Sequence, residues 1–192
     1  IKEYSCIPSV SIHSDFYNHP LFIKSYVNLI NDTLKNYSPD LLLFSFHGLP
    51  ERQIHKSGCQ LANQCRSQAC PHTQEKNRQC YRAQCYETAR LIAHSLELSD
   101  DQYQVAFQSR LGRTPWIQPY TDLLLPALAK RGIKKLAIVC PSFVADCLET
   151  LEEIGILANE QWQALTGESI KLIPCLNART DWADAIATFI KD

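Results

Sequence analysis

Leu41-Leu42-Leu43-Phe44-Ser45-Phe46 is a nearly continuous apolar run that ends at His47-Gly48-Leu49-Pro50. Such a run is typical of a strand that is buried on both faces of a sheet. The Gly and Pro that follow it indicate a loop. Sheets with both faces buried are parallel and are covered by helices. The rest of the chain should therefore alternate strands with helices.

The flanking sequence supplies that alternation. Helical spacing of apolar residues covers 20–37, 81–98, 119–130, 143–165 and 182–190, and strand patterns cover 103–108, 135–140 and 170–174. We predict an α/β fold with a parallel four-stranded sheet flanked by helices, a Rossmann-like architecture. Residues 51–79 break the pattern, because they are rich in Gln, basic and poor in large apolar side chains. We expect them to form most of a Cys-rich insertion after the first strand.

Composition narrows the functional classes. The 192 residues carry 19 Lys+Arg and 20 Asp+Glu, a net charge of −1, which argues against nucleic acid as the main partner. There is no apolar run long enough to cross a membrane and no signal-peptide pattern, so we expect a cytoplasmic protein. The chain contains no Met, which indicates a fragment or a processed product.

Cysteine is unusually frequent and unevenly placed. Nine cysteines cannot all pair, and the chain has no secretory signal, so a reducing compartment is expected. Cys6, Cys140 and Cys175 are interpreted as small buried hydrophobes. Five others lie within 27 residues: Cys59, Cys65, Cys70, Cys80 and Cys85. Their spacing lacks the C-x2-C pairs of most structural zinc sites, and a metal or iron–sulfur centre is the simplest reason for the cluster.

The carboxyl ends of parallel strands are where ligands bind in such folds. His47 lies at the end of the most apolar strand, where it could act as a base or a metal ligand, or only hydrogen-bond its loop. Gly48 would let a ligand approach closely. Asp146, Glu149 and Glu153 are spaced to share one face of a helix. That face is either a cation site or a solvated acidic surface.

The loop after residue 108 holds a second group of candidates. Ser109, Arg110 and Trp116 could hold a flat ligand with carboxylate groups by stacking and ion pairing, or form a surface loop capped by the Trp. The chain has no glycine-rich dinucleotide or phosphate loop, no H-E-x-x-H and no G-x-S-x-G. Dinucleotide enzymes, simple NTPases and common hydrolases are therefore disfavoured.

Three stretches together resemble the ferrochelatase family, whose members insert ferrous iron into a porphyrin to form haem. They are residues 41–50, residues 108–121 (Gln-Ser-Arg-Leu-Gly-Arg-Thr-Pro-Trp-Ile-Gln-Pro-Tyr-Thr) and residues 140–154 (Cys-Pro-Ser-Phe-Val-Ala-Asp-Cys-Leu-Glu-Thr-Leu-Glu-Glu-Ile). The third is the most specific and is similar to the bacterial form. The resemblance runs from about Ser11 to the C-terminus and covers only the second half of the family.

The resemblance implies two similar α/β domains with a porphyrin cleft between them. Residues 1–16 would lead in from the first domain, and residues 17–165 would form the chelatase-like C-terminal domain with its insertion at 51–87. Residues 166–192 would add the last strand and the C-terminal helix. The first domain, one wall of the cleft, is expected to be the main partner of this chain, and the 192 residues alone are expected to be inactive.

The resemblance also assigns roles to residues. His47 matches the active-site His, Glu149 matches the carboxylate that faces it, and Asp146 and Glu153 match the acidic path for the iron. Ser109, Arg110 and Trp116 match the porphyrin-binding loop. Many members carry His where this chain has Cys147, so a metal role at that position is in doubt.

A cofactor is implied as well. Some bacterial members hold a [2Fe-2S] cluster in a segment after the His-Gly-Leu-Pro motif, and Cys80 with Cys85 resembles part of that segment. We expect four of the five clustered Cys as ligands, with Cys80 and Cys85 the surest and the other three competing for two places. A structural and a sensing role are both open. So are a homodimer and a peripheral membrane contact.

The chemistry supports the same function. Inserting iron requires the loss of two pyrrole protons, and His47 suits a base that works near neutral pH. A row of carboxylates ending at an imidazole would let ferrous iron, the substrate, exchange its water stepwise. Two alternatives stand: a cobalt or sirohydrochlorin chelatase, which the stretch from Asp146 to Glu153 disfavours, and a non-catalytic iron–sulfur module.

Overall fold

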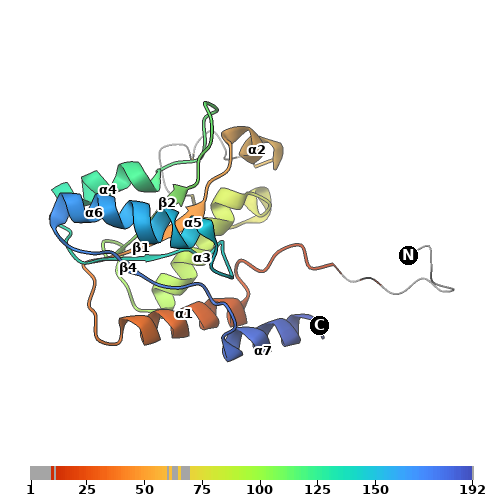
Figure 1. The fold of residues 1–192 in the computed structure, drawn as a ribbon. Coiled ribbons are helices and arrows are strands. Elements are labelled where there is room, and N and C mark those ends of the chain that lie inside the picture. Colours follow the sequence, from red (N-terminus) through yellow and green to blue (C-terminus); the bar gives the residue numbers. More distant parts are fainter. Residues whose placement is uncertain (1–9, 11, 60, 62–64, 66–69, 192) are drawn as a thin grey trace.

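The computed structural model describes residues 10, 12–59, 61, 65 and 70–191 (Figure 1). Within these residues, four parallel strands form one sheet in the order β2-β1-β3-β4. The strands are β1 (Leu41–His47), β2 (Tyr103–Gln108), β3 (Leu136–Val139) and β4 (Lys171–Leu172). The predicted parallel α/β sheet is confirmed, and the strand that carries His47 is one of its two central strands.

Helices cover both faces of the sheet (Figure 1). One layer contains α1 (Pro20–Leu34), α3 (Tyr81–Ser95) and α7 (Thr180–Phe189). The other contains α4 (Thr121–Lys130), a π-helical turn η2 (Glu153–Ala158) and α6 (Asn159–Thr166). Three short elements lie at the edges: α2 (Glu51–Lys56), the 3-10 turn η1 (Glu75–Asn77) and α5 (Leu148–Leu151).

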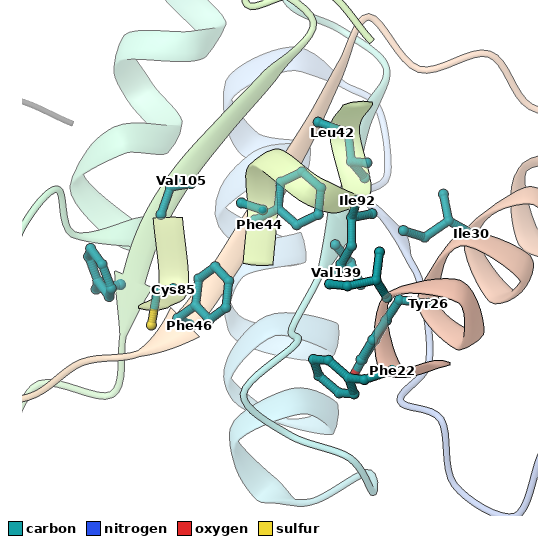
Figure 2. Packing of buried hydrophobic residues seen from close by; sticks show 14 of the residues in the cluster. Phe22, Tyr26, Ile30, Leu42, Phe44, Phe46, Cys85, Ile92, Val105 and Val139 are labelled. Carbon is teal, nitrogen blue, oxygen red and sulfur yellow. The ribbon is translucent and has the colours of Figure 1, made fainter. Parts of the chain in front are cut away.

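Alternate residues of β1 enter the two layers. Phe44 and Phe46 point toward the layer of α1 and α3, where Tyr26 and Ile92 lie (Figure 2). Leu43 points the other way, into the cluster formed with α4 and α6. Each large apolar side chain buried in this way contributes about 1.5–3 kcal/mol to folding. The apolar run is continuous because neither face of the strand meets solvent.

The element bounds differ from the prediction in two places. β4 is shorter than predicted, since its ladder ends at Leu172 and Pro174 has no N–H to extend it. The helix expected over 143–165 begins only at Leu148. Its predicted break near Gly155 is the wide turn η2, where a Cβ on Gly155 would lie 3.3 Å from Leu172 Cδ2. The close packing of η2 against β4 therefore favours glycine, which has no side chain, at position 155.

The described part of the Cys-rich insertion contains regular structure and contributes side chains to the hydrophobic core. Its described part forms α2 and η1, and Ile54, Cys70 and Cys80 are buried in the core layer of α1 and α3. Cys140 and Cys175 are buried, as predicted, whereas Cys6 and most of the segment 1–16 lie outside the described residues. No helix in the described part of the chain is long and apolar enough to cross a membrane.

Candidate functional site

His47 ends β1 at the carboxyl edge of the sheet and is half-buried. Its Nδ1 lies 2.6 Å from the carbonyl oxygen of Gly48. Because a carbonyl oxygen only accepts, Nδ1 carries a proton in this bond, so in the neutral form of the ring the lone pair lies on Nε2. The ring has two aromatic neighbours, Phe143 at 5.9 Å and Trp116 at 6.3 Å between ring centroids. The neutral tautomer that this geometry selects is therefore the one with Nε2 free to accept a proton.

A cavity of about 490 Å³ lies beside this imidazole. Its walls are mainly apolar and aromatic, and they include Phe16, Phe46 and Phe143 together with His47. Its polar side chains include Asp15, Tyr81, Gln84, Thr88 and Ser142. A cavity with aromatic walls and few polar groups suits a large, flat and mostly apolar ligand.

Glu149 lies in α5 at the same edge and has its own polar neighbours. A hydrogen bond from the Cys147 thiol, and more weakly the charge of a protonated His47, hold the pKa of the Glu149 carboxyl below its usual range. Glu149 is therefore an ionised carboxylate at neutral pH. Both predicted residues lie at the carboxyl edge of the sheet, His47 at the end of β1 and Glu149 in α5.

Gln108, which the sequence analysis did not single out as a site residue, holds this edge together. Its buried side-chain oxygen accepts a hydrogen bond from Ser45 Oγ at 2.7 Å. Its Nε2 donates to the backbone oxygen of Glu149 at 2.6 Å and to Glu153 Oε2 at 3.2 Å. A buried side-chain amide is stable when its oxygen and its nitrogen both have hydrogen-bond partners, as they do here. The only signal for it in the sequence was a polar residue at the end of a buried strand.

The other two acids of the row, Asp146 and Glu153, accept hydrogen bonds from the protein itself. The Asp146 carboxylate accepts from the backbone N–H of Cys175 at 3.0 Å and from Asn177 Nδ2 at 2.6 Å. Glu153 accepts from the backbone N–H of Ser109 at 2.7 Å and from its hydroxyl. Asp146 precedes α5, so the expectation that all three acids share one helical face is wrong. A strand-end turn, rather than a helix, sets the place of Asp146.

The predicted porphyrin-binding loop is split between two places. Trp116 lies beside His47, with its Nε1 donating to the Leu111 carbonyl at 2.9 Å. Arg110 forms a bidentate ion pair with Asp122, at 2.6 and 2.7 Å, and lies 4.3 Å from the centre of the Tyr120 ring. Ser109 and Arg110 line a separate hollow of about 280 Å³ with Glu153. The structure places them apart from the His47 cavity.

Gly48 is explained by the protein itself rather than by a ligand. A Cβ at this position would lie 2.9 Å from the backbone oxygen of Gln108 and 3.2 Å from the Trp116 ring. We expect Gly48→Ala to lower the free energy of unfolding by about 1–3 kcal/mol, because backbone and a packed ring must shift. Urea denaturation would measure this loss. An unchanged midpoint would show that the loop accommodates the methyl group.

Asp146 should make stability depend on pH. Burial alone would raise its pKa, but hydrogen bonds from Asn177, Cys175 and Thr150 outweigh burial and lower the pKa. Its stabilisation is therefore present above the unfolded-state pKa of about 3.9 and is lost as the pH falls through the lower folded-state value. We expect Asp146→Asn to cost about 1–3 kcal/mol at pH 7 and progressively less below pH 4. A difference from the parent that does not vary with pH would contradict this.

Of the five clustered cysteines, four form two pairs of neighbouring thiols and the fifth, Cys85, lines the His47 cavity. The Cys65 and Cys70 thiols contact each other, as do those of Cys59 and Cys80. Burial, followed by the neighbouring Cys65, raises the pKa of the Cys70 thiol to about 12. Cys85 instead lines the His47 cavity and lies near Phe46 and Val105 (Figure 2). Among the residues that the structure describes, no three His, Cys, Asp or Glu side chains converge on one metal-ion site.

Comparison with known proteins identifies the family. The family model for ferrochelatase matches residues 1–192. A ferrochelatase of Coxiella burnetii (strain RSA 493 / Nine Mile phase I) is 54% identical over 191 residues, which is 100% of this chain and 54% of the relative. A ferrochelatase of Legionella pneumophila (strain Philadelphia 1) is 50% identical over 192 residues, 100% of this chain and 56% of the relative. The chain spans about half the length of these relatives. With a family match along its whole length and relatives of this name at 50–54% identity, the chain belongs to the ferrochelatase family.

Proposed function

We propose that the protein containing this chain inserts ferrous iron into a porphyrin and so forms haem. The observation that carries the proposal is the imidazole of His47 in the wall of an aromatic cavity, with the Glu149 carboxylate in α5 at the same edge of the sheet. The ferrochelatase names of the relatives support it. Because the chain spans about half of those relatives, the activity is proposed for the full-length protein.

The two residues suit different parts of the reaction. A neutral porphyrin and Fe²⁺ give haem and two protons, so each iron inserted requires two pyrrole N–H groups to lose their protons. The free Nε2 of His47 is the group suited to accept them one at a time, passing the first proton to solvent before it takes the second, since the Nδ1 proton is held by Gly48. Glu149 has a lowered pKa, which makes it a weak base but a good oxygen ligand for the incoming Fe²⁺.

The cavity supplies the remaining requirements. Phe143 and Trp116 are the aromatic neighbours of the imidazole, at 5.9 and 6.3 Å between ring centroids. An aromatic wall of this kind favours a flat macrocycle. We propose porphyrin contact for Trp116. For Arg110 the same role requires that a porphyrin carboxylate displace Asp122 from its ion pair.

We propose that iron approaches along the acidic segment, with Glu153 as an outer ligand and Glu149 as the inner one. Support comes from Gln108, whose amide binds both the Glu149 backbone and the Glu153 carboxylate. Iron at Glu153 would replace the hydrogen bonds from Ser109. Asp146 is more suited to holding the segment in place, because its carboxylate accepts hydrogen bonds from Cys175 and Asn177.

The test is a metal-insertion assay on the full-length protein with protoporphyrin IX and either Fe²⁺ or Co²⁺, prepared without oxygen. Turnover with Fe²⁺ supports the proposal, and porphyrin binding followed by fluorescence gives its affinity. A clear preference for Co²⁺ would favour a cobalt-type chelatase instead. Absence of porphyrin binding would favour a non-catalytic iron–sulfur module.

We also propose that the Cys-rich insertion holds a [2Fe-2S] cluster through Cys59, Cys65, Cys70 and Cys80. In such a cluster each iron is bound by two thiolates, and the contacts of these thiols are pairwise, Cys59 with Cys80 and Cys65 with Cys70. A two-iron cluster also spans more space than one metal ion, which fits two pairs better than a single converging site. When bound, it would supply cross-links that order the segment and a centre able to exchange one electron.

The charges around these thiols fit the same group. Arg82 is buried and contacts Cys70, and its Nη1 donates to Glu51 Oε1 at 3.1 Å. A buried guanidinium offsets the negative charge that four thiolates bring. The test is the iron, sulfide and zinc content of protein purified without oxygen. Equal iron and sulfide support the cluster, whereas a colourless protein that holds zinc would overturn it.

A further inference from the structure

Hydroxyl groups from two other elements hold the backbone of His47. The His47 N–H donates to Ser142 Oγ at 2.9 Å. The Tyr81 hydroxyl donates to the His47 carbonyl at 2.8 Å. Ser142 is also a hydrogen-bonding neighbour of the Tyr81 hydroxyl. Residues from the end of β1, the loop after β3 and the start of α3 therefore meet around one backbone unit.

The peptide plane between His47 and Gly48 is anchored at both ends. Its carbonyl accepts from Tyr81, and its N–H donates to the Gln108 backbone oxygen at 2.8 Å. The Gly48 carbonyl belongs to the next peptide, which is joined to the anchored one at the Gly48 Cα, so a shift of the anchored peptide would move this carbonyl as well. That carbonyl is the partner of His47 Nδ1. The Tyr81 hydroxyl thus lies one peptide away from the bond that selects the imidazole tautomer.

Tyr81 is itself held firmly. It is the first residue of α3, and Cys80 directly before it is the cap of that helix. The next residue, Arg82, is buried and bonds Glu51 at the start of α2. The Cys85 thiol, one turn along, contacts the Tyr81 hydroxyl. The first turn of α3 therefore bonds the His47 loop on both sides of Gly48, through Tyr81 to His47 and through Arg82 to Glu51.

We propose that Tyr81 is a positioning residue for His47, whose hydroxyl fixes the peptide after His47 and so keeps the Nδ1–Gly48 bond that leaves Nε2 as the base. The inference deepens the proposed metal insertion and rests on it. Tyr81 acts through His47, and its aromatic ring serves only as part of the cavity wall.

The test is Tyr81→Phe in the full-length protein, which removes the hydroxyl and keeps the ring. Imidazole ¹⁵N shifts of the porphyrin-free protein, with His47 assigned by its loss in His47→Ala, should show one tautomer in the parent and a mixture in the variant. We expect kcat for metal insertion to fall about fivefold, the size of one lost hydrogen bond, with the porphyrin KM within twofold. The matched control is Tyr86→Phe on the same helix, whose ring packs on Phe107 and which should change neither readout.

Ser142→Ala provides a second variant, because it removes the other hydroxyl from the His47 backbone and should change the spectrum in the same direction. An unchanged ¹⁵N pattern in both variants would overturn the proposal, as would an unchanged kcat in Tyr81→Phe. The proposed metal insertion and the proposed role of Tyr81 are tested by different measurements, so one can fail without the other. If the parent inserts no metal, the proposed function fails, while the nitrogen spectra still decide whether Tyr81 positions His47.

Discussion

Replacing His47 by alanine in the full-length protein should lower kcat for iron insertion by about 10²–10⁴-fold, the usual contribution of a general base. The loss follows from the state of the ring, because Nδ1 is bonded to Gly48 and Nε2 is the nitrogen with a free lone pair. Porphyrin affinity should stay within a few fold, since the cavity is lined mainly by apolar side chains that remain.

The measurement is steady-state metal insertion together with porphyrin fluorescence titration of the same samples. His94→Ala is the matched control, because His94 is an exposed residue in the last turn of α3. It should leave both kcat and affinity unchanged. Retained turnover in His47→Ala would remove His47 from its role. A loss of porphyrin binding equal to the loss of turnover would make it a binding residue instead.

Cys80→Ser should abolish the iron–sulfur cluster, with protein-bound iron and sulfide falling close to zero. A serine oxygen is a poor ligand for cluster iron, and Cys80 belongs to one of the two thiol pairs. Cys85→Ser should keep the parent's iron and sulfide, because Cys85 lies in the cavity wall beside Phe46 rather than in a thiol pair. Visible absorbance of protein prepared without oxygen reports both variants.

Cys85→Ser and Cys59→Ser together separate two sets of ligands, because Cys80 belongs to both sets. From the resemblance alone, Cys80 and Cys85 were expected to be the surest ligands. If Cys85→Ser bleaches the protein and Cys59→Ser does not, that expectation holds and the thiol pairs are not the ligands. If neither substitution changes the iron content, the clustered cysteines are not the site.

The parallel sheet could be predicted because it depends on local pattern. From Leu41 to Phe46, β1 is apolar at every position but Ser45, and that pattern is typical of a strand covered on both sides. His47 could be singled out for the same reason, since the residue after a buried strand lies at the ligand edge. The wide turn η2 could be located only as a break near Gly155, because its form depends on packing against β4.

The sequence by itself determined the alternation of strands and helices along the chain, and it singled out His47 and Glu149 as candidates at the ligand edge of the sheet. Only the tertiary structure decided how those residues are held. Gln108, Ser142 and Tyr81 reach the site across 34 to 95 residues of sequence, through individual side-chain hydrogen bonds. Periodicity reports which face a residue occupies, whereas a hydrogen bond depends on where two distant backbones finally come to lie.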